Sequence, residues 1–80
     1  MKIKLGQYQH YKGNFYEVVG TARHSETLEG MVVYKALYRS KFGKNSLWVR
    51  PLEMFMERVF VNGKLVRRFK KIATAKDAKW

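Results

Sequence analysis

The sequence predicts one small all-β domain whose short strands curl into a barrel. The β-branched and aromatic residues occur in short runs separated by six glycines, a pattern typical of short strands joined by tight turns. No segment sustains the i, i+3, i+4, i+7 apolar spacing of a long amphipathic helix. The dipeptide Asn62-Gly63 separates two strand-like runs and favours a type I′ hairpin turn.

The first two strands are predicted at Gln7–Tyr11 and Phe15–Arg23. The turn between them, Lys12–Asn14, contains a glycine and an asparagine, either of which accepts a positive φ. Gly20 lies inside the second strand and predicts a β-bulge, which bends a sheet at that point.

The middle of the chain alternates strands with polar loops. The first predicted elements are a loop at His24–Gly30 with one helical turn at Glu26–Glu29, and a strand at Met31–Arg39. They are followed by a loop at Ser40–Ser46, a strand at Leu47–Arg50 and a helical turn at Leu52–Met56. Pro51 ends the fourth strand. Alternation within the third strand places Val32, Tyr34, Ala36 and Tyr38 on one face.

The last two strands, Glu57–Val61 and Lys64–Phe69, flank the Asn62-Gly63 turn. A two-residue loop fixes their register. The expected pairs are Val61 with Lys64, Phe60 with Leu65, Val59 with Val66, Arg58 with Arg67, and Glu57 with Arg68. The last pair joins opposite charges, whereas Arg58 and Arg67 are a like-charge pair that costs some stability unless it is screened.

Five to six short strands with one helical turn suggest a small barrel, because closure removes exposed strand edges. The chain of 80 residues has room for a single hydrophobic core. We predict that residues 1–72 form this domain and that residues 73–80 form a basic C-terminal tail.

Composition excludes several functional classes. The chain has no cysteine, so disulfide scaffolds, thiolate zinc sites and thiol catalysis are excluded. Its two histidines show no metal-ligand spacing, and we expect neither a metal nor a cofactor. No Ser-His-acid order or glycine-rich phosphate loop is present, so catalysis is disfavoured. No signal peptide and no membrane-length apolar run occurs, so we expect a cytoplasmic protein without a membrane partner.

The net charge of +11 is unevenly distributed along the chain. Residues 64–80 carry seven basic residues and only Asp77, a net of +6, whereas residues 13–63 are nearly balanced. A strongly basic segment indicates either a solvated surface or nucleic-acid binding. The sequence leaves both interpretations open.

Four segments together resemble a known bacterial family. They are His10–Asn14 with Tyr16–Val18, Ala22–Glu29, Val33–Tyr34 with Ala36–Tyr38, and Leu47–Phe55. They are similar to the family known as domain of unknown function 1653, over Tyr8 to about Ile72. The resemblance implies an SH3-like barrel and a small stand-alone bacterial protein. It implies no established activity.

The motifs of that resemblance predict a non-catalytic binding module for a peptide or a small polar ligand. They concentrate charged and hydroxyl residues that a barrel core does not need, and SH3-like barrels often bind peptides beside the short helical turn. The predicted ligand-binding residues are Tyr11, Arg23, His24, Glu26, Trp48, Arg50 and Glu53. Three alternatives stay open: Ser25 or Thr27 caps a turn, the aromatic residues fill the core, and Arg50 pairs with Glu53.

The rival hypothesis is an RNA- or DNA-binding surface at the C-terminal hairpin. There an aromatic residue alternates with cations, a pattern suited to binding phosphates and stacking bases. The residues that would carry it are Arg58, Phe60, Arg67, Arg68, Lys70 and Lys71. The competing interpretation is a charged final strand that leads into the tail.

Overall fold

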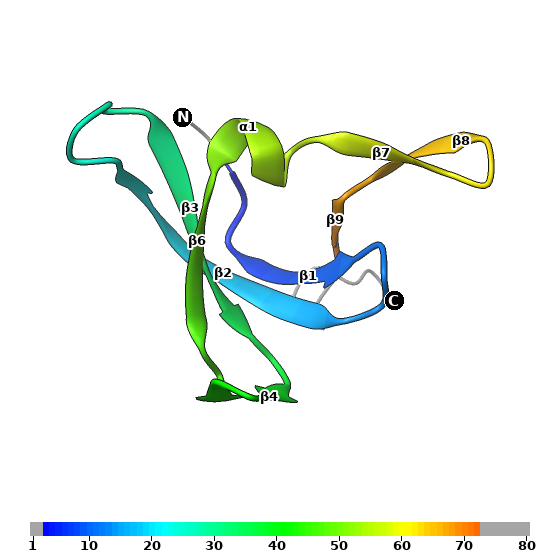
Figure 1. Cartoon of the computed structure of the whole chain (residues 1–80), viewed down its shortest axis with the longest axis horizontal. Helices are drawn as coiled ribbons and strands as arrows, with labels where there is room; N and C mark the ends of the chain where they lie inside the picture. The colour runs from blue at the N-terminus through cyan, green and yellow to red at the C-terminus, as the bar shows by residue number, and fades with distance from the viewer. Residues whose placement is uncertain (1–2, 73–80) are drawn as a thin grey trace, which may run out of the picture.

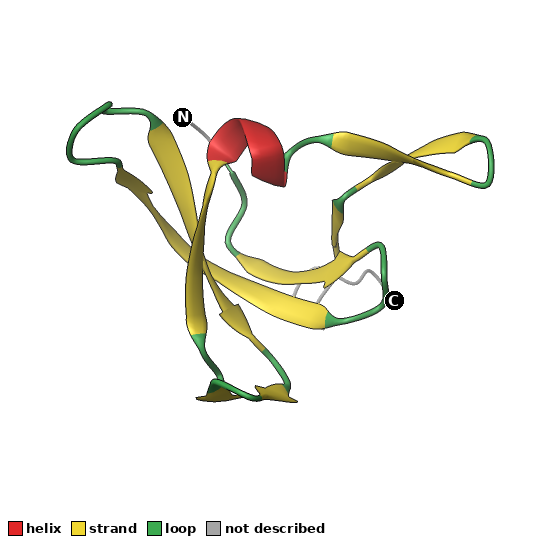
Figure 2. Cartoon of the chain, in the orientation of Figure 1, coloured by secondary structure: helices red, strands yellow, loops and turns green. Residues whose placement is uncertain are grey.

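Five strands form one antiparallel sheet in the computed structural model of the chain, which describes residues 3–72 (Figures 1 and 2). The sheet has the order β6-β3-β2-β1-β9. Its strands are β1 (Gly6–His10), β2 (Phe15–Arg23), β3 (Gly30–Ala36), β6 (Leu47–Pro51) and β9 (Phe69–Lys71). The predicted all-β class is confirmed.

Two glycines shape the β1–β2 side of the sheet as the sequence indicates. Gly13 has a φ of +113° in the turn between the strands, a conformation that disfavours side chains. The register of β2 against β3 shifts between Val18 and Gly20, which is the predicted bulge. The bulge helps the sheet to curve around one face.

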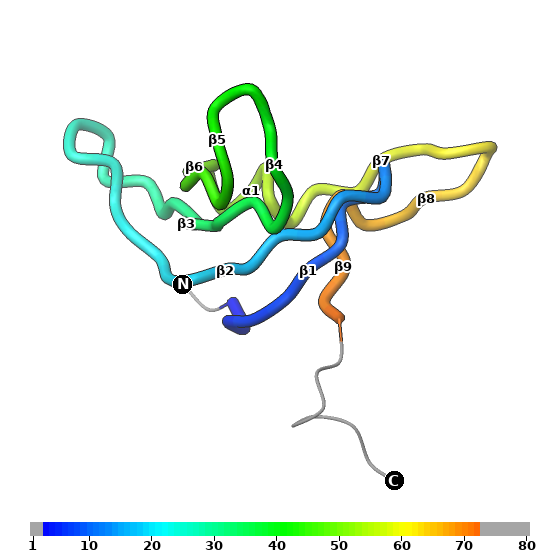
Figure 3. Tube along the Cα trace, turned by 90° about the horizontal axis from the view of Figure 1, so that it is seen from below, coloured from blue at the N-terminus to red at the C-terminus, as the bar shows by residue number. Residues whose placement is uncertain are grey.

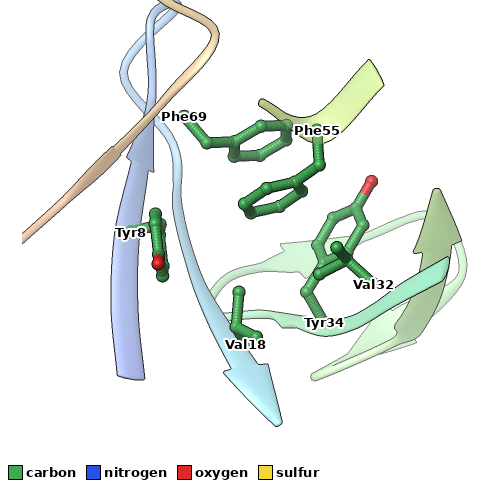
Figure 4. Packing of buried hydrophobic residues seen from close by; sticks show 6 residues of the cluster. All are labelled: Tyr8, Val18, Val32, Tyr34, Phe55 and Phe69. Carbon is green, nitrogen blue, oxygen red and sulfur yellow. The ribbon is translucent and has the colours of Figure 1, made fainter. Parts of the chain in front are cut away.

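The core lies on that concave face. Its buried cluster is Tyr8, Val18, Val32, Tyr34, Phe55 and Phe69 (Figure 4). Val32, Tyr34 and Ala36, which the alternation along β3 places on one face, are buried. Phe55 comes from the helix α1 (Leu52–Phe55), and its ring stacks on that of Phe69 with centroids 4.2 Å apart.

The sheet does not close into a barrel, which corrects the expected SH3-like barrel. Strands β6 and β9 are the two edges and do not pair with each other. Phe55, only 1% exposed, reaches from α1 to stack on Phe69 of β9. The Arg50 guanidinium on β6 lies 5.7 Å from the Phe69 ring centre. Side chains therefore connect the two edges where backbone hydrogen bonds were expected.

The C-terminal hairpin forms with the predicted register. It consists of β7 (Arg58–Val61) and β8 (Lys64–Arg67), and the four pairs from Val61 with Lys64 to Arg58 with Arg67 are confirmed. Positive φ values at both Asn62 and Gly63 fit the predicted turn. The hairpin projects away from the sheet (Figures 1 and 3).

The predicted final strand is divided at Arg68. Lys64–Arg67 pairs with β7, whereas Phe69–Lys71 pairs with β1. Two hydrogen bonds stabilise the chain at this division. Arg68 donates its backbone N–H to the Glu57 carbonyl and a guanidinium N–H to the Glu57 carboxylate. The expected Glu57–Arg68 ion pair is therefore confirmed. The break lets one continuous segment serve both the hairpin and the sheet.

Two predictions for the middle of the chain need correction. The third strand ends at Ala36, and the expected loop contains a short hairpin of β4 (Arg39–Ser40) and β5 (Gly43–Lys44). The positive φ of Gly43 permits this tight pairing. The loop after β2 contains a single turn, closed by the hydrogen bond from Leu28 N–H to the His24 carbonyl. A second hydrogen bond, from His24 N–H to the Glu29 carbonyl, joins the two ends of the loop.

Two sequence predictions concern the C-terminal end and membrane insertion. The C-terminal tail, residues 73–80, lies outside the described residues. Within the described part, no helix has the length and apolar character needed to cross a membrane.

Candidate functional site

A basic groove separates the projecting hairpin from the sheet. Its volume is about 710 Å³, and it lies where the end of β1 and strand β9 face β7 and β8. Tyr11 donates its backbone N–H to the Arg68 carbonyl at 2.9 Å, which ties β1 to the base of the hairpin. The groove is lined by Gln9, His10, Tyr11, Val61, Asn62, Lys64, Val66, Arg67 and Lys70.

The charged residues that line the basic groove, within the described part of the chain, are all cations. They are Lys64, Arg67 and Lys70, and no carboxylate from residues 3–72 is among the lining residues. The ion pairs found in residues 3–72 join Lys35 to Glu17 and Arg68 to Glu57, so none of them includes these three cations. Unopposed cations in a concave surface attract anions, so the basic groove can bind an anionic ligand.

His10 adds a neutral hydrogen-bond donor to the basic groove. Burial lowers the pKa of His10, and the charges of Arg68, Arg50 and Lys12 lower it further. The Nδ1 atom accepts the Lys12 backbone N–H at 3.1 Å. In the neutral ring the proton therefore lies on Nε2. The ring also lies 4.6 Å from that of Tyr11, centre to centre.

The residues predicted to bind a peptide or small polar ligand are spread over several places. Arg23 and Glu53 line a second hollow of about 320 Å³, together with Glu29, Gly30 and Leu52. Tyr11 lies in the basic groove instead. The structure thus brings together one cation and one carboxylate of the predicted set.

His24 and Glu26 belong to the loop that follows β2. The His24 Nδ1 atom accepts the backbone N–H groups of Glu26 and Thr27, at 3.1 and 3.3 Å. Thr27 Oγ1 accepts the Glu29 N–H at 3.3 Å. His24 and Thr27 therefore accept the backbone N–H groups of this turn, a role that the sequence left open for Ser25 or Thr27. These contacts fix the loop conformation.

Trp48 and Arg50 lie on β6, on the concave side of the sheet. Arg50 donates from Nε to the Tyr34 hydroxyl at 3.2 Å, and its guanidinium lies over Phe69. Trp48 contacts the ring of Phe42 with centroids 5.5 Å apart. The alternative ion pair of Arg50 with Glu53 is absent from the described residues.

Only part of the residue set of the nucleic-acid hypothesis lies in the basic groove. Arg67 and Lys70 line the basic groove. Arg58 and Phe60 are outside its lining, and Phe60 is 75% exposed. Arg68 pairs with Glu57, and Lys71 donates to the Ile72 carbonyl.

Sequence reasoning missed much of the basic groove. Gln9, His10, Val61, Asn62, Lys64 and Val66 line it but were not among the predicted site residues. The hairpin register already placed Val61, Lys64 and Val66 on one face. The missing information was the position of β1 opposite that face, which depends on the pairing of β1 with β9.

The described residues show no constellation for metal chemistry. No group of three or more His, Cys, Asp or Glu side chains able to hold a metal ion occurs within residues 3–72. The chemistry that the basic groove offers is that of charge, aromatic rings and hydrogen-bond donors.

Comparison with known proteins assigns the family. The model of a protein family of unknown function, DUF1653, matches residues 6–71. The chain belongs to this family. The match spans the whole sheet, α1 and the projecting hairpin, and it confirms the resemblance detected in the sequence.

A solved structure supports the DUF1653 assignment. The crystal structure of a DUF1653 protein from Bordetella bronchiseptica is similar, with 35% sequence identity and a TM-score of 0.78. The match covers 89% of this chain and 88% of that one. No protein with a curated description matches this DUF1653 chain.

Proposed function

We propose that this DUF1653 protein is a non-catalytic binding module whose basic groove holds a single-stranded nucleic acid. One observation carries the proposal: among residues 3–72, three cations and no carboxylate line the basic groove. Among the ligands considered, a phosphate-bearing strand suits that charge better than a neutral peptide does. The family assignment carries no activity of its own.

The phosphate contacts come from Lys64, Arg67 and Lys70. All three side chains are exposed and free to reach a backbone. Arg67 can hold a phosphate through two parallel N–H groups, whereas the lysines act as point charges. Neutralising phosphates releases counterions, so binding must weaken as salt rises.

The base contacts come from the β1 end of the basic groove. Tyr11 is 39% exposed, and Lys12 lies 5.9 Å from its ring centre. An exposed tyrosine ring beside cations is a platform on which a base stacks. The amide groups of Gln9 and Asn62 supply hydrogen-bond donors and acceptors for base edges.

The volume favours a single strand over a duplex. About 710 Å³ is the size of a small-molecule site, which admits a few nucleotides of one strand. The hairpin and the sheet would have to separate to admit a double helix. We therefore expect single strands to bind more tightly than duplexes of equal length.

A fluorescence-polarisation titration tests the proposal with labelled 12-nucleotide RNA and DNA single strands. The triple variant Lys64→Ser, Arg67→Ser and Lys70→Ser should abolish binding. In the native protein the logarithm of affinity should fall with the logarithm of salt concentration with a slope of about −2, for three contacts.

The control removes the same charge elsewhere. Arg39, Lys41 and Lys44 lie on the β4–β5 hairpin, outside the basic groove. Changing these three to serine should leave affinity within about threefold at 0.15 M salt, because distant charges are screened there. Equal losses in the two triple variants would contradict a site in the basic groove.

A small polar ligand in the hollow of about 320 Å³ is the second candidate. Arg23 brings a guanidinium, and Glu29 and Glu53 bring carboxylates, to one lining. This combination suits a small molecule that carries both charges. NMR titration with free amino acids should then shift the signals of Arg23 and Glu53, and the variant Glu53→Gln should abolish those shifts.

A further inference from the structure

The two edges of the sheet differ in how they are protected. The β9 edge has three residues, two of which are lysines. Short length and charge are the usual means of preventing edge-to-edge pairing. The β6 edge has five residues, Leu47–Pro51, of which Leu47 is 65% exposed and Val49 is 61% exposed. Only Arg50 is charged there, and its guanidinium turns inward over Phe69.

The backbone of β6 presents free hydrogen-bonding groups to solvent. Ala36 donates its N–H to the Ser46 carbonyl at 2.9 Å, in register with the pairing of β3 and β6. Hydrogen-bonded pairs alternate along an antiparallel ladder. The groups of Trp48 and Arg50 therefore point toward β3, and those of Leu47 and Val49 point away from the sheet.

Pro51 agrees with that alternation. It pairs in register with Met31 at the end of β6, although proline has no N–H to donate. Proline is tolerated in a sheet where its nitrogen faces the free edge. The backbone groups of residues 47, 49 and 51 therefore point away from β3. The Ala36 N–H to Ser46 carbonyl hydrogen bond predicts the same three positions.

We propose that β6 is a self-association edge, through which two copies of this protein form an antiparallel dimer with a continuous ten-stranded sheet. The two-fold axis passes beside Val49, the middle residue of β6, so the whole strand pairs with itself. Each copy donates the N–H groups of Leu47 and Val49 to carbonyl groups of the other. This association is independent of the ligand bound in the basic groove.

The side chains of β6 are complementary to themselves in this register. Val49 lies opposite Val49 of the second copy, and Leu47 lies opposite Pro51 of the second copy, which covers apolar side chains on the convex face. On the concave face Trp48 lies opposite Arg50 of the second copy, whose guanidinium is turned inward over Phe69, so no charge is buried between the two strands. Like charges do not meet in any of these pairs.

The charge of the protein permits this contact. The strongest excess lies in residues 64–80, outside β6, and Arg50, the one charged residue of β6, turns its guanidinium inward over Phe69. Screening at 0.15 M salt acts over roughly 8 Å. We therefore expect association to strengthen as salt rises, the opposite of nucleic-acid binding.

Hydrogen exchange combined with sedimentation tests the proposal on the full chain. At high protein concentration the mass should approach twice 9.5 kDa, and the amides of Leu47 and Val49 should become protected. The amides of Trp48 and Arg50 should be protected at every concentration, because they bond to β3. A monomer at millimolar concentration, with Leu47 and Val49 exchanging freely, would overturn the proposal.

Two variants locate the contact. Val49→Lys places two ammonium groups opposite each other and should raise the dissociation constant at least about tenfold. Because the chain has no cysteine, Val49→Cys provides a single thiol near the two-fold axis, and mild oxidation should join two copies. Leu65→Cys, on the exposed face of the β7–β8 hairpin, is the matched control and should cross-link far more slowly. Equal rates would contradict the two-fold axis at Val49.

Discussion

The sheet with α1 and the projecting β7–β8 hairpin are held together by different interactions. In the sheet, aromatic residues distant in sequence meet: Phe55 stacks on Phe69, and both contact Tyr34. In the hairpin, residues adjacent across a two-residue turn meet, and Phe60 and Leu65 remain exposed. One region depends on long-range packing and the other on local turn chemistry.

Because of this difference, the residues that determine the stability of the fold are largely distinct from those available to bind a ligand. Residues in the aromatic core cannot change without loss of packing, whereas the exposed face of the hairpin can change with little effect on folding. The basic groove lies between the two regions, so the core fixes one wall and the hairpin carries the other. Substitutions confined to one region should therefore leave the other largely unchanged.

The largest effect is expected from Phe55→Ala. This ring is almost fully buried, and its removal leaves a cavity against Phe69. The free energy of unfolding should fall by about 3–5 kcal/mol, measured by urea unfolding. Phe60→Ala in the hairpin is the control, and its effect should stay within about 0.5 kcal/mol. Similar losses in both variants would mean that the hairpin packs as part of the core.

A smaller and more local effect is expected from Gly63→Ala. Gly63 has a φ of +79° in the hairpin turn, where a Cβ atom costs roughly 1–2 kcal/mol. Amide exchange in β7 and β8 should accelerate while exchange in β1–β3 is unchanged. Gly20→Ala is the matched control, because a Cβ atom added there would meet nothing within 4 Å and the φ of Gly20 is not in the positive region. Acceleration throughout the sheet would show that the hairpin is not independent.

The Glu57–Arg68 ion pair at the base of the hairpin should contribute less to the free energy of unfolding than the turn glycine does. Both Glu57 and Arg68 are partly exposed, and exposed pairs are worth about 0.2–1 kcal/mol. Glu57→Gln should lower the free energy of unfolding within that range, with a smaller effect in 1 M salt. Glu17→Gln, which removes the looser 3.4 Å pair with Lys35, is the comparison and should cost less. The reverse order would contradict a bracing role for Glu57.

The smallest effect concerns the pH dependence contributed by His10. Burial lowers its pKa in the folded state below the ordinary value of 6.5, so the unfolded chain binds the proton more readily. The stability that neutral His10 provides is present above pH 6.5 and is lost as pH falls through the folded-state pKa. His10→Gln should flatten the acid side of a plot of unfolding free energy against pH. An unchanged slope would exclude His10 as its source.

Turn chemistry was the part of the fold most readable from the sequence. Asn62-Gly63 specified the hairpin register, Gly13 the first turn and Gly20 the bulge, because each acts within a few residues of itself. The alternation along β3 also identified which side chains share a face, and the structure shows that Val32, Tyr34 and Ala36 on that face are buried. These features need no knowledge of distant contacts.

The candidate site was only partly predictable. Arg67 and Lys70 were found from the density of positive charge, and Tyr11 was found as part of a different surface. His10, Gln9 and Lys64 were missed because their common position depends on β1 lying beside the hairpin. The division of the last strand at Arg68 creates that arrangement, and no local signal marks it.

The sequence by itself determined the all-β class, the turns, the hairpin register and the absence of thiol chemistry, since these follow from residue type and short-range sterics. Only the tertiary structure decided that the sheet stays open. Phe55 from α1 stacks on Phe69 between the two edges, and the resulting packing leaves the outer side of β6 without a hydrogen-bonded neighbour among residues 3–72. The open sheet results from side-chain packing between segments that are distant in the sequence. The pattern of neighbouring residues does not predict that packing.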